Sequence, residues 1–117
     1  MRKFFYLGSC STCQRIMGEL DLSGLELRDI KKEAMTPDEV DEMGKLAGSF
    51  EKLFSRKAMK YRAMGLHEKE LKESDYRSYI LEEYTFLSRP VLVFDEQIFI
   101  GNSKKNVAAM QAFLAQV

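Results

Sequence analysis

Two cysteines near the N-terminus have the residue type and spacing best suited to chemistry. Cys10 and Cys13 are the only cysteines of the chain, and such a C-x-x-C pair indicates redox chemistry or a metal. Half of a zinc site needs a second pair of ligands, and His67 is the one histidine available. Thiol–disulfide exchange without a metal is therefore the favoured interpretation. The alternatives are a zinc site shared between molecules and two inert structural cysteines.

The segments beside the cysteines predict a strand and a helix. Residues 4–7 form the apolar run FFYL, which is ended by Gly8 and is typical of a buried strand. After a short turn, apolar side chains recur at the spacing of one helical face, and these are Cys13, Ile16, Met17 and Leu20. Cys10 falls at the predicted helix start, where unpaired N–H groups favour a thiolate. We expect Cys10 to have a lowered pKa and to attack, and Cys13 to resolve the product.

Composition limits the class of protein. The 117 residues are 45% hydrophobic, which suits a single domain over residues 1–117 with a moderate core. Eighteen basic and eighteen acidic residues cancel, so no overall field draws the chain to nucleic acid or a membrane. The N-terminal apolar run is too short for a signal peptide, and polar residues follow it directly. We expect a cytoplasmic protein that binds neither nucleic acid nor a membrane directly.

The order of the elements predicts the fold. A second strand at residues 25–28 completes a parallel βαβ unit. A helical insertion at about 36–86 follows; Thr36 and Glu39 predict a capping box at its start, and Ser74 predicts another helix start. That second helix should present Tyr76, Tyr79, Ile80 and Tyr84 on one face.

The C-terminal third predicts two strands and a helix. The apolar run 90–94 and residues 97–100 flank Asp95-Glu96 and predict an antiparallel hairpin. Ser103 is the expected cap of a last helix, whose inward residues are Val107, Met110, Phe113, Leu114 and Val117. The order βαβ, helical insertion, ββα predicts an α/β, thioredoxin-like fold with one mixed four-stranded sheet.

Two further groups of residues are candidates for the site. In a thioredoxin-like sheet, Pro90 at a strand start would be cis and lie beside the cysteine loop, and Arg89 would then point near Cys10. The alternative for Arg89 is a solvated surface residue. A cationic cluster could hold an oxyanion or a glutathione carboxylate, or form a solvated face; it consists of Lys52, Arg56, Lys57, Lys60 and Arg62. His67 is expected to be an ordinary surface residue.

The chain resembles the arsenate reductase (ArsC)/Spx family of thioredoxin-fold proteins over nearly its whole length. Four segments carry the resemblance: FYLGSCSTC at 5–13, GSFEKLFSRK at 48–57, LSRPVLV at 87–93 and IGNS at 100–103. For arsenate reductases, the resemblance implies that Cys10 attacks arsenate and that Arg56 and Arg89 hold the oxyanion. A third family arginine would fall at about Gly101, where this chain has none. Glutathione and glutaredoxin would remove the product.

Other branches of the same family imply other roles. Cys13 matches the second cysteine of Spx-type regulators, in which the pair is a disulfide switch. Those regulators bind the C-terminal domain of the RNA polymerase α subunit through a surface around the glycine that matches Gly48. The short C-terminus resembles a small branch suspected of glutathione-linked thiol reduction.

We therefore expect a thiol oxidoreductase that uses glutathione as a co-substrate and holds no bound cofactor or metal. Glutaredoxin or thioredoxin would be its protein partner. A redox-sensing regulator of RNA polymerase and an arsenate reductase proper are the alternatives.

Overall fold

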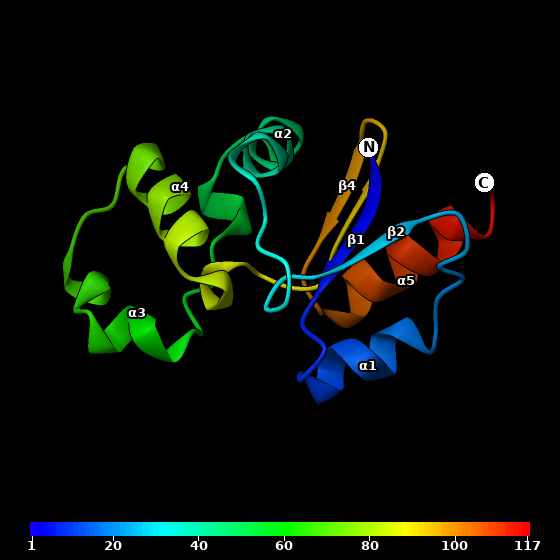
Figure 1. The fold of residues 1–117 in the computed structure, drawn as a ribbon, viewed down its shortest axis with the longest axis horizontal. Helices are drawn as coiled ribbons and strands as arrows, with labels where there is room; N and C mark the ends of the chain where they lie inside the picture. The colour runs from blue at the N-terminus through cyan, green and yellow to red at the C-terminus, as the bar shows by residue number, and fades with distance from the viewer. The chain divides into compact units, whose positions relative to one another are not determined.

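The computed structural model describes all residues 1–117, and they divide into two compact units (Figure 1). The first unit combines Met1–Glu33 with Arg89–Val117, and the second is Ala34–Ser88. None of the helices has the length and apolar character needed to cross a bilayer. The first unit contains β1 (Arg2–Tyr6), α1 (Ser11–Met17), β2 (Glu26–Asp29), β3 (Val91–Phe94), β4 (Gln97–Ile100) and α5 (Lys104–Leu114).

The four strands form one mixed sheet in the order β2-β1-β3-β4. β1 and β2 are parallel, with Phe4 opposite Leu27. β1 and β3 are antiparallel, with Phe4 opposite Leu92. β3 and β4 form the antiparallel hairpin around Asp95-Glu96. The predicted α/β class and mixed four-stranded sheet are confirmed.

The core of the first unit lies between one face of the sheet and the helices α1 and α5. Phe4 and Leu92 on that face pack with Ile16 of α1 and Met110 of α5, and none of the four is exposed. Ser103 caps α5, because its hydroxyl accepts the N–H of Asn106 at 3.1 Å. These contacts hold α1, and therefore its N-terminal cysteine, firmly on the sheet.

The expectation that Val117 faces inward is wrong. α5 ends at Leu114, and Val117 is 65% exposed. Helical periodicity places a side chain on the inner face only while the helix continues. Val117 lies three residues past the last helical turn, where that periodicity no longer applies.

The second unit contains helices only, joined by short loops (Figure 1). The predicted capping box is present in α2, where Thr36 and Glu39 each accept a backbone N–H of the other. An aromatic cluster centres on Phe54, whose ring lies 5.0 Å from those of both Tyr76 and Phe86. The helices are α2 (Pro37–Ala47), α3 (Met59–Ala63) and α4 (Glu73–Glu82) with the 3-10 turns η1 (Glu51–Leu53), η2 (Leu66–Glu68) and η3 (Tyr84–Phe86).

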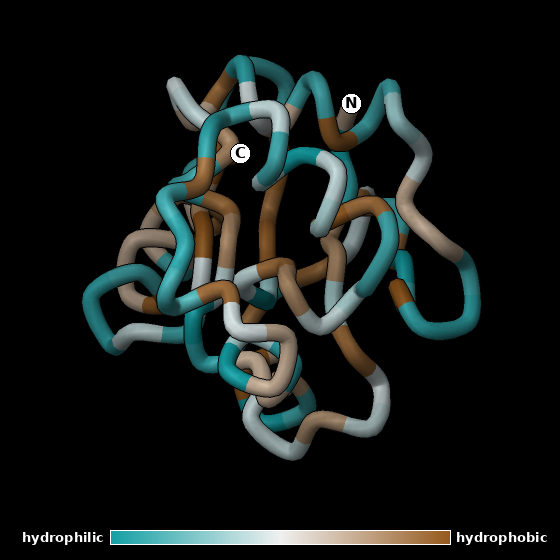
Figure 2. The backbone as a smooth tube through the Cα atoms, turned by 90° about the vertical axis from the view of Figure 1, so that its left-hand side faces the viewer, coloured by the Kyte–Doolittle hydropathy of each residue, from teal (hydrophilic) through white to brown (hydrophobic).

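The start predicted for the second long helix is wrong by two residues. Lys72, not Ser74, occupies the cap position of α4, and the carboxylate of Asp75 accepts the Lys72 N–H at 2.8 Å. An acceptor three residues into the helix therefore satisfies the free donor, and Ser74 lies inside the helix. Tyr76 and Ile80 face inward as expected, but Tyr84 belongs to η3. Figure 2 shows the alternation of short hydrophobic and hydrophilic stretches along the backbone.

Candidate active site

The two cysteines lie where a tight loop joins β1 to α1. Cys10 is the cap residue of α1, and its N–H donates to the carbonyl of Leu7 at 3.0 Å. The side-chain amide of Gln14 donates to the carbonyl of Gly8 at 3.0 Å, which ties the first helical turn back to the loop. Cys10 is half-buried, whereas Cys13 is fully buried. The same loop therefore gives the two thiols different access to solvent.

The environments of the two thiols also differ electrostatically. Burial raises the pKa of Cys10, but several effects outweigh it and leave that pKa lowered: N–H groups of Cys13 and Thr12, the Cys13 thiol and the charge of Arg89. The pKa of Cys13 is raised, chiefly by burial and further by the neighbouring Cys10. A thiolate at Cys10 with a thiol at Cys13 is therefore the favoured protonation state.

Arg89 and Pro90 enter the first unit directly before β3. The Arg89–Pro90 peptide bond is cis. The Nε atom of Arg89 is buried, and its guanidinium charge acts on both cysteines. The structure thus places Arg89 within electrostatic reach of Cys10 and Cys13. Pro90, directly before β3, is at the same end of the sheet as the end of β1.

Arg56 belongs to the second unit, in a local network of its own. Its guanidinium donates to the carboxylate of Glu51 at 2.7 Å and to the hydroxyl of Tyr76 at 3.0 Å. Lys60 pairs with Glu83. The predicted cationic cluster is therefore partly neutralised by its own acidic neighbours. His67 is exposed, as expected, and its ring lies 6.2 Å from that of Tyr61.

A pocket of about 510 Å³ opens beside the cysteine loop. Its lining includes Tyr6 at the end of β1 and Asp29 at the end of β2. The lining residues are Tyr6, Gly8, Ser9, Gln14, Asp29, Lys31 and Lys32. Sequence reasoning did not identify any of them as a site residue. The available signal was that parallel neighbouring strands bring their carboxyl ends to one edge, so the residues after each strand meet there.

Asp29 shapes the wall of this pocket. A Cβ on Gly8 would lie 2.4 Å from Asp29 Oδ2, so a larger residue there would displace the carboxylate. Asp29 Oδ1 accepts the N–H of Lys31 at 3.1 Å, and the Asp29 carbonyl accepts the N–H of Lys32 at 3.1 Å. This turn places the two lysines at the pocket rim.

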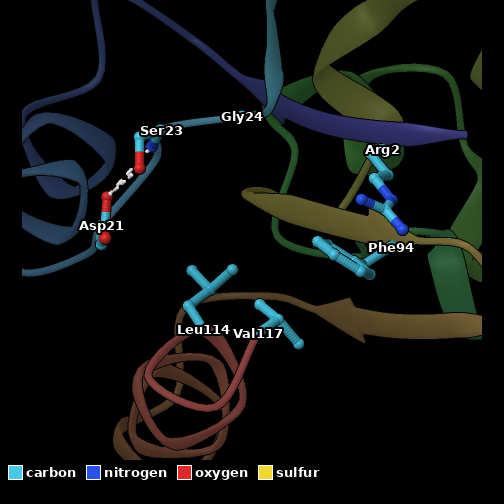
Figure 3. A pocket seen from close by; sticks show the side chains of 7 residues that line it. All are labelled: Arg2, Asp21, Ser23, Gly24, Phe94, Leu114 and Val117. Carbon is cyan, nitrogen blue, oxygen red and sulfur yellow. Dashed lines mark hydrogen bonds between the residues drawn. The ribbon is translucent and has the colours of Figure 1, made fainter.

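A second, smaller pocket of about 140 Å³ lies at the other end of β1 from the cysteines (Figure 3). Arg2 stacks over the ring of Phe94 and pairs with Asp95, while Asp21 accepts the hydroxyl of Ser23 at 2.6 Å. No cysteine lines this pocket. No cluster of three or more histidine, cysteine or carboxylate side chains in the protein is arranged to hold a metal.

Comparison with known proteins gives a consistent family and fold. The model of the ArsC family matches residues 5–110. A possible arsenate reductase from Streptococcus mutans UA159 is 27% identical, with a TM-score of 0.71, and the match covers 89% of this chain and 92% of that one. SACOL0876 from Staphylococcus aureus COL is 25% identical, with a TM-score of 0.74 and coverage of 93% and 97%.

Arsenate reductase from Vibrio cholerae shares the thioredoxin-like fold at 15% identity, with a TM-score of 0.76 and coverage of 93% and 96%. A comparison with curated proteins found no match.

Proposed function

The chain belongs to the ArsC family, and from that premise we propose that it is a thiol-dependent oxidoreductase with Cys10 as its nucleophile. The observation that carries this proposal is the inequality of the two thiols. Cys10 is partly accessible and has a lowered pKa, while Cys13 is buried with a raised pKa. An accessible thiolate next to a protonated partner is the arrangement that thiol–disulfide exchange requires.

The proposed reaction proceeds in two exchange steps. The Cys10 thiolate attacks one sulfur of a substrate disulfide, and the other sulfur leaves as a thiolate with the bonding electron pair. Cys13 then loses its proton and attacks Cys10, so that the bound half of the substrate leaves and a Cys10–Cys13 disulfide forms. The substrate is reduced by two electrons and the cysteine pair is oxidised. Glutathione, glutaredoxin or thioredoxin would reduce the pair again in the cytoplasm.

In the proposed reaction, two arginines would bind anionic groups. Arg89 would stabilise the Cys10 thiolate and an anionic group of the substrate, which its charge at the cysteines supports. Arg56 would bind a further substrate anion. Its side chain is 48% exposed and is oriented by hydrogen bonds to Glu51 and Tyr76.

Cysteine variants test the proposal. Wild-type protein is mixed with a small mixed disulfide of glutathione, and NADPH consumption is followed with glutathione reductase. Cys10→Ser should abolish turnover, because no nucleophile remains. Cys13→Ser should accumulate a mixed disulfide on Cys10 that mass spectrometry detects. Turnover that is unchanged in Cys10→Ser would overturn the proposal.

Arsenate reduction is the second candidate, and the 27% identical structure described as a possible arsenate reductase favours it. Against it, Gly101 occupies the expected place of a third arginine and has a φ of +93°, which side-chain-bearing residues rarely adopt. We therefore prefer disulfide exchange over arsenate reduction as the proposed function. Arsenate-dependent consumption of reductant, with glutaredoxin present, would reverse this order, and a flat trace would exclude the second candidate.

A further inference from the structure

We propose that the pocket beside the cysteine loop is a substrate subsite in which Lys31 and Lys32 select disulfides that carry carboxylates. This inference rests on the proposed nucleophilic role of Cys10. The ligand class is a small disulfide whose carboxylates outnumber its ammonium groups, such as that of a short acidic peptide. Gly8, Asp29 and the two lysines would then set specificity together with the arginines considered above.

The position of the pocket is the first argument. Ser9 lines it and directly precedes Cys10 in the chain. Gln14 also lines it and is held against the carbonyl of Gly8 at 3.0 Å. A ligand in the pocket would therefore contact the loop residues directly before Cys10 and the first turns of α1 after it. Its volume of about 510 Å³ falls within the range of roughly 300–1,000 Å³ that is typical of small-molecule sites.

The charges of the lining are the second argument. Lys31 and Lys32 are exposed, and neither ammonium group forms an ion pair within the protein. Asp29 supplies one carboxylate, which the turn to Lys31 holds in place. Two ammonium groups and one carboxylate complement a ligand that has two carboxylates and one ammonium group. Tyr6 and Gln14 also line the pocket and add no charge to it.

The chemical step follows from this placement. The lysines hold the carboxylates of one half of the disulfide, and the Cys10 thiolate attacks the sulfur of that half. A bond forms between Cys10 and this sulfur, the substrate S–S bond breaks, and the other half leaves as a thiolate. The lysines take no part in bond making, so they are specificity residues and not catalytic ones.

A pair of disulfide reagents tests the inference. Reduced full-length protein is mixed in a stopped-flow instrument with the anionic 5,5′-dithiobis(2-nitrobenzoate) or the neutral 4,4′-dithiodipyridine. The ratio of the two rate constants is compared for wild type and the double variant Lys31→Gln/Lys32→Gln. We expect the anionic-to-neutral ratio to fall roughly 3- to 10-fold, as expected for losing two partly solvated charge contacts.

The matched control is Lys104→Gln/Lys105→Gln, which removes the same charge from α5. The control should keep the wild-type ratio of rate constants. Lys31→Arg/Lys32→Arg retains both positive charges, so its ratio should stay close to that of the wild type. A ratio that does not change in Lys31→Gln/Lys32→Gln, or that falls equally in the control, overturns the subsite while Cys10 reactivity stands. Failure of both reagents to modify Cys10 would overturn the proposed function, and the subsite with it.

Discussion

The pKa of Cys10 results from opposing electrostatic effects on its sulfur atom. Burial disfavours the thiolate, while backbone N–H groups, the Cys13 thiol and Arg89 favour it, and the result is a lowered pKa. Cys13 is more deeply buried, and burial is the main reason that its pKa is raised. Its thiol also donates to Cys10 and lies next to the negative charge of that sulfur, which raises the pKa further. The difference between the two pKa values therefore arises from position along one helical turn and not from residue type.

Arg89→Gln should raise the pKa of Cys10, because it removes the one cationic side chain that lowers it. At neutral pH the thiolate fraction falls, and alkylation by iodoacetamide slows. The measurement is the rate of alkylation against pH in a Cys13→Ser background, whose midpoint should move to higher pH. Arg15→Gln removes an arginine of the same helix that pairs with Glu19, and it should leave the midpoint in place. A midpoint that Arg89→Gln does not move would contradict the role of its charge.

In α2, the absence of a side chain at Gly44 allows a close packing contact with Phe50. Gly44 is buried in α2, and a Cβ there would lie 2.5–3.0 Å from three atoms of the Phe50 ring. The ring therefore packs directly against the helix backbone. Glu73 of α4 accepts the N–H groups of Phe50 and Glu51 at 2.7 and 3.2 Å, which fixes the segment that carries the ring.

Gly44→Ala should destabilise the protein, although alanine favours helices by about 1 kcal/mol over glycine. The clash with Phe50 should exceed that gain, since overpacking typically costs about 1–3 kcal/mol. Urea denaturation followed by circular dichroism measures the free energy of unfolding. Adding Phe50→Leu should make Gly44→Ala less harmful than it is alone. A stabilising Gly44→Ala would show that the ring moves aside without cost.

Over the whole molecule, the balanced charges form many local pairs. Hydrogen bonds lower the pKa values of four carboxylates, namely Asp21 with Ser23, Asp41 with Arg77, Glu83 with Lys60 and Asp95 with Arg2. A carboxylate whose pKa is lower in the folded state stabilises that state at pH values above its unfolded pKa. This contribution is lost as the pH falls through the folded value.

The free energy of unfolding should therefore decrease as the pH falls below about 4, the usual pKa range of aspartate and glutamate. Urea denaturation at pH 7, 5 and 3 measures this dependence. Asp41→Asn should make the decrease smaller, because it removes one of the titrating carboxylates. Asp21, Asp41 and Asp95 are exposed, so their individual effects should be small. Equal stability at pH 5 and pH 3 would contradict the role of these pairs.

The sequence by itself determined the features that depend on neighbouring residues. Apolar runs predicted β1 and β3, Thr36 and Ser103 predicted helix caps that the structure contains, and Asp95-Glu96 predicted the hairpin. Local patterns succeed here because a strand, a cap or a tight turn is stabilised within a few residues. The single-domain organisation and the roles of Cys13 and Arg56 stay predictions.

Tertiary structure decided which distant residues meet. Glu73 of α4 accepts the N–H groups of Phe50 and Glu51, more than twenty residues earlier in the chain. The pocket beside Cys10 arises because β2 pairs in parallel with β1 and brings Asp29 against Gly8. No local pattern encodes such a contact, since it depends on strand register and on the absence of a single Cβ. Periodicity shows which face of an element is buried, and only the assembled sheet shows what that face meets.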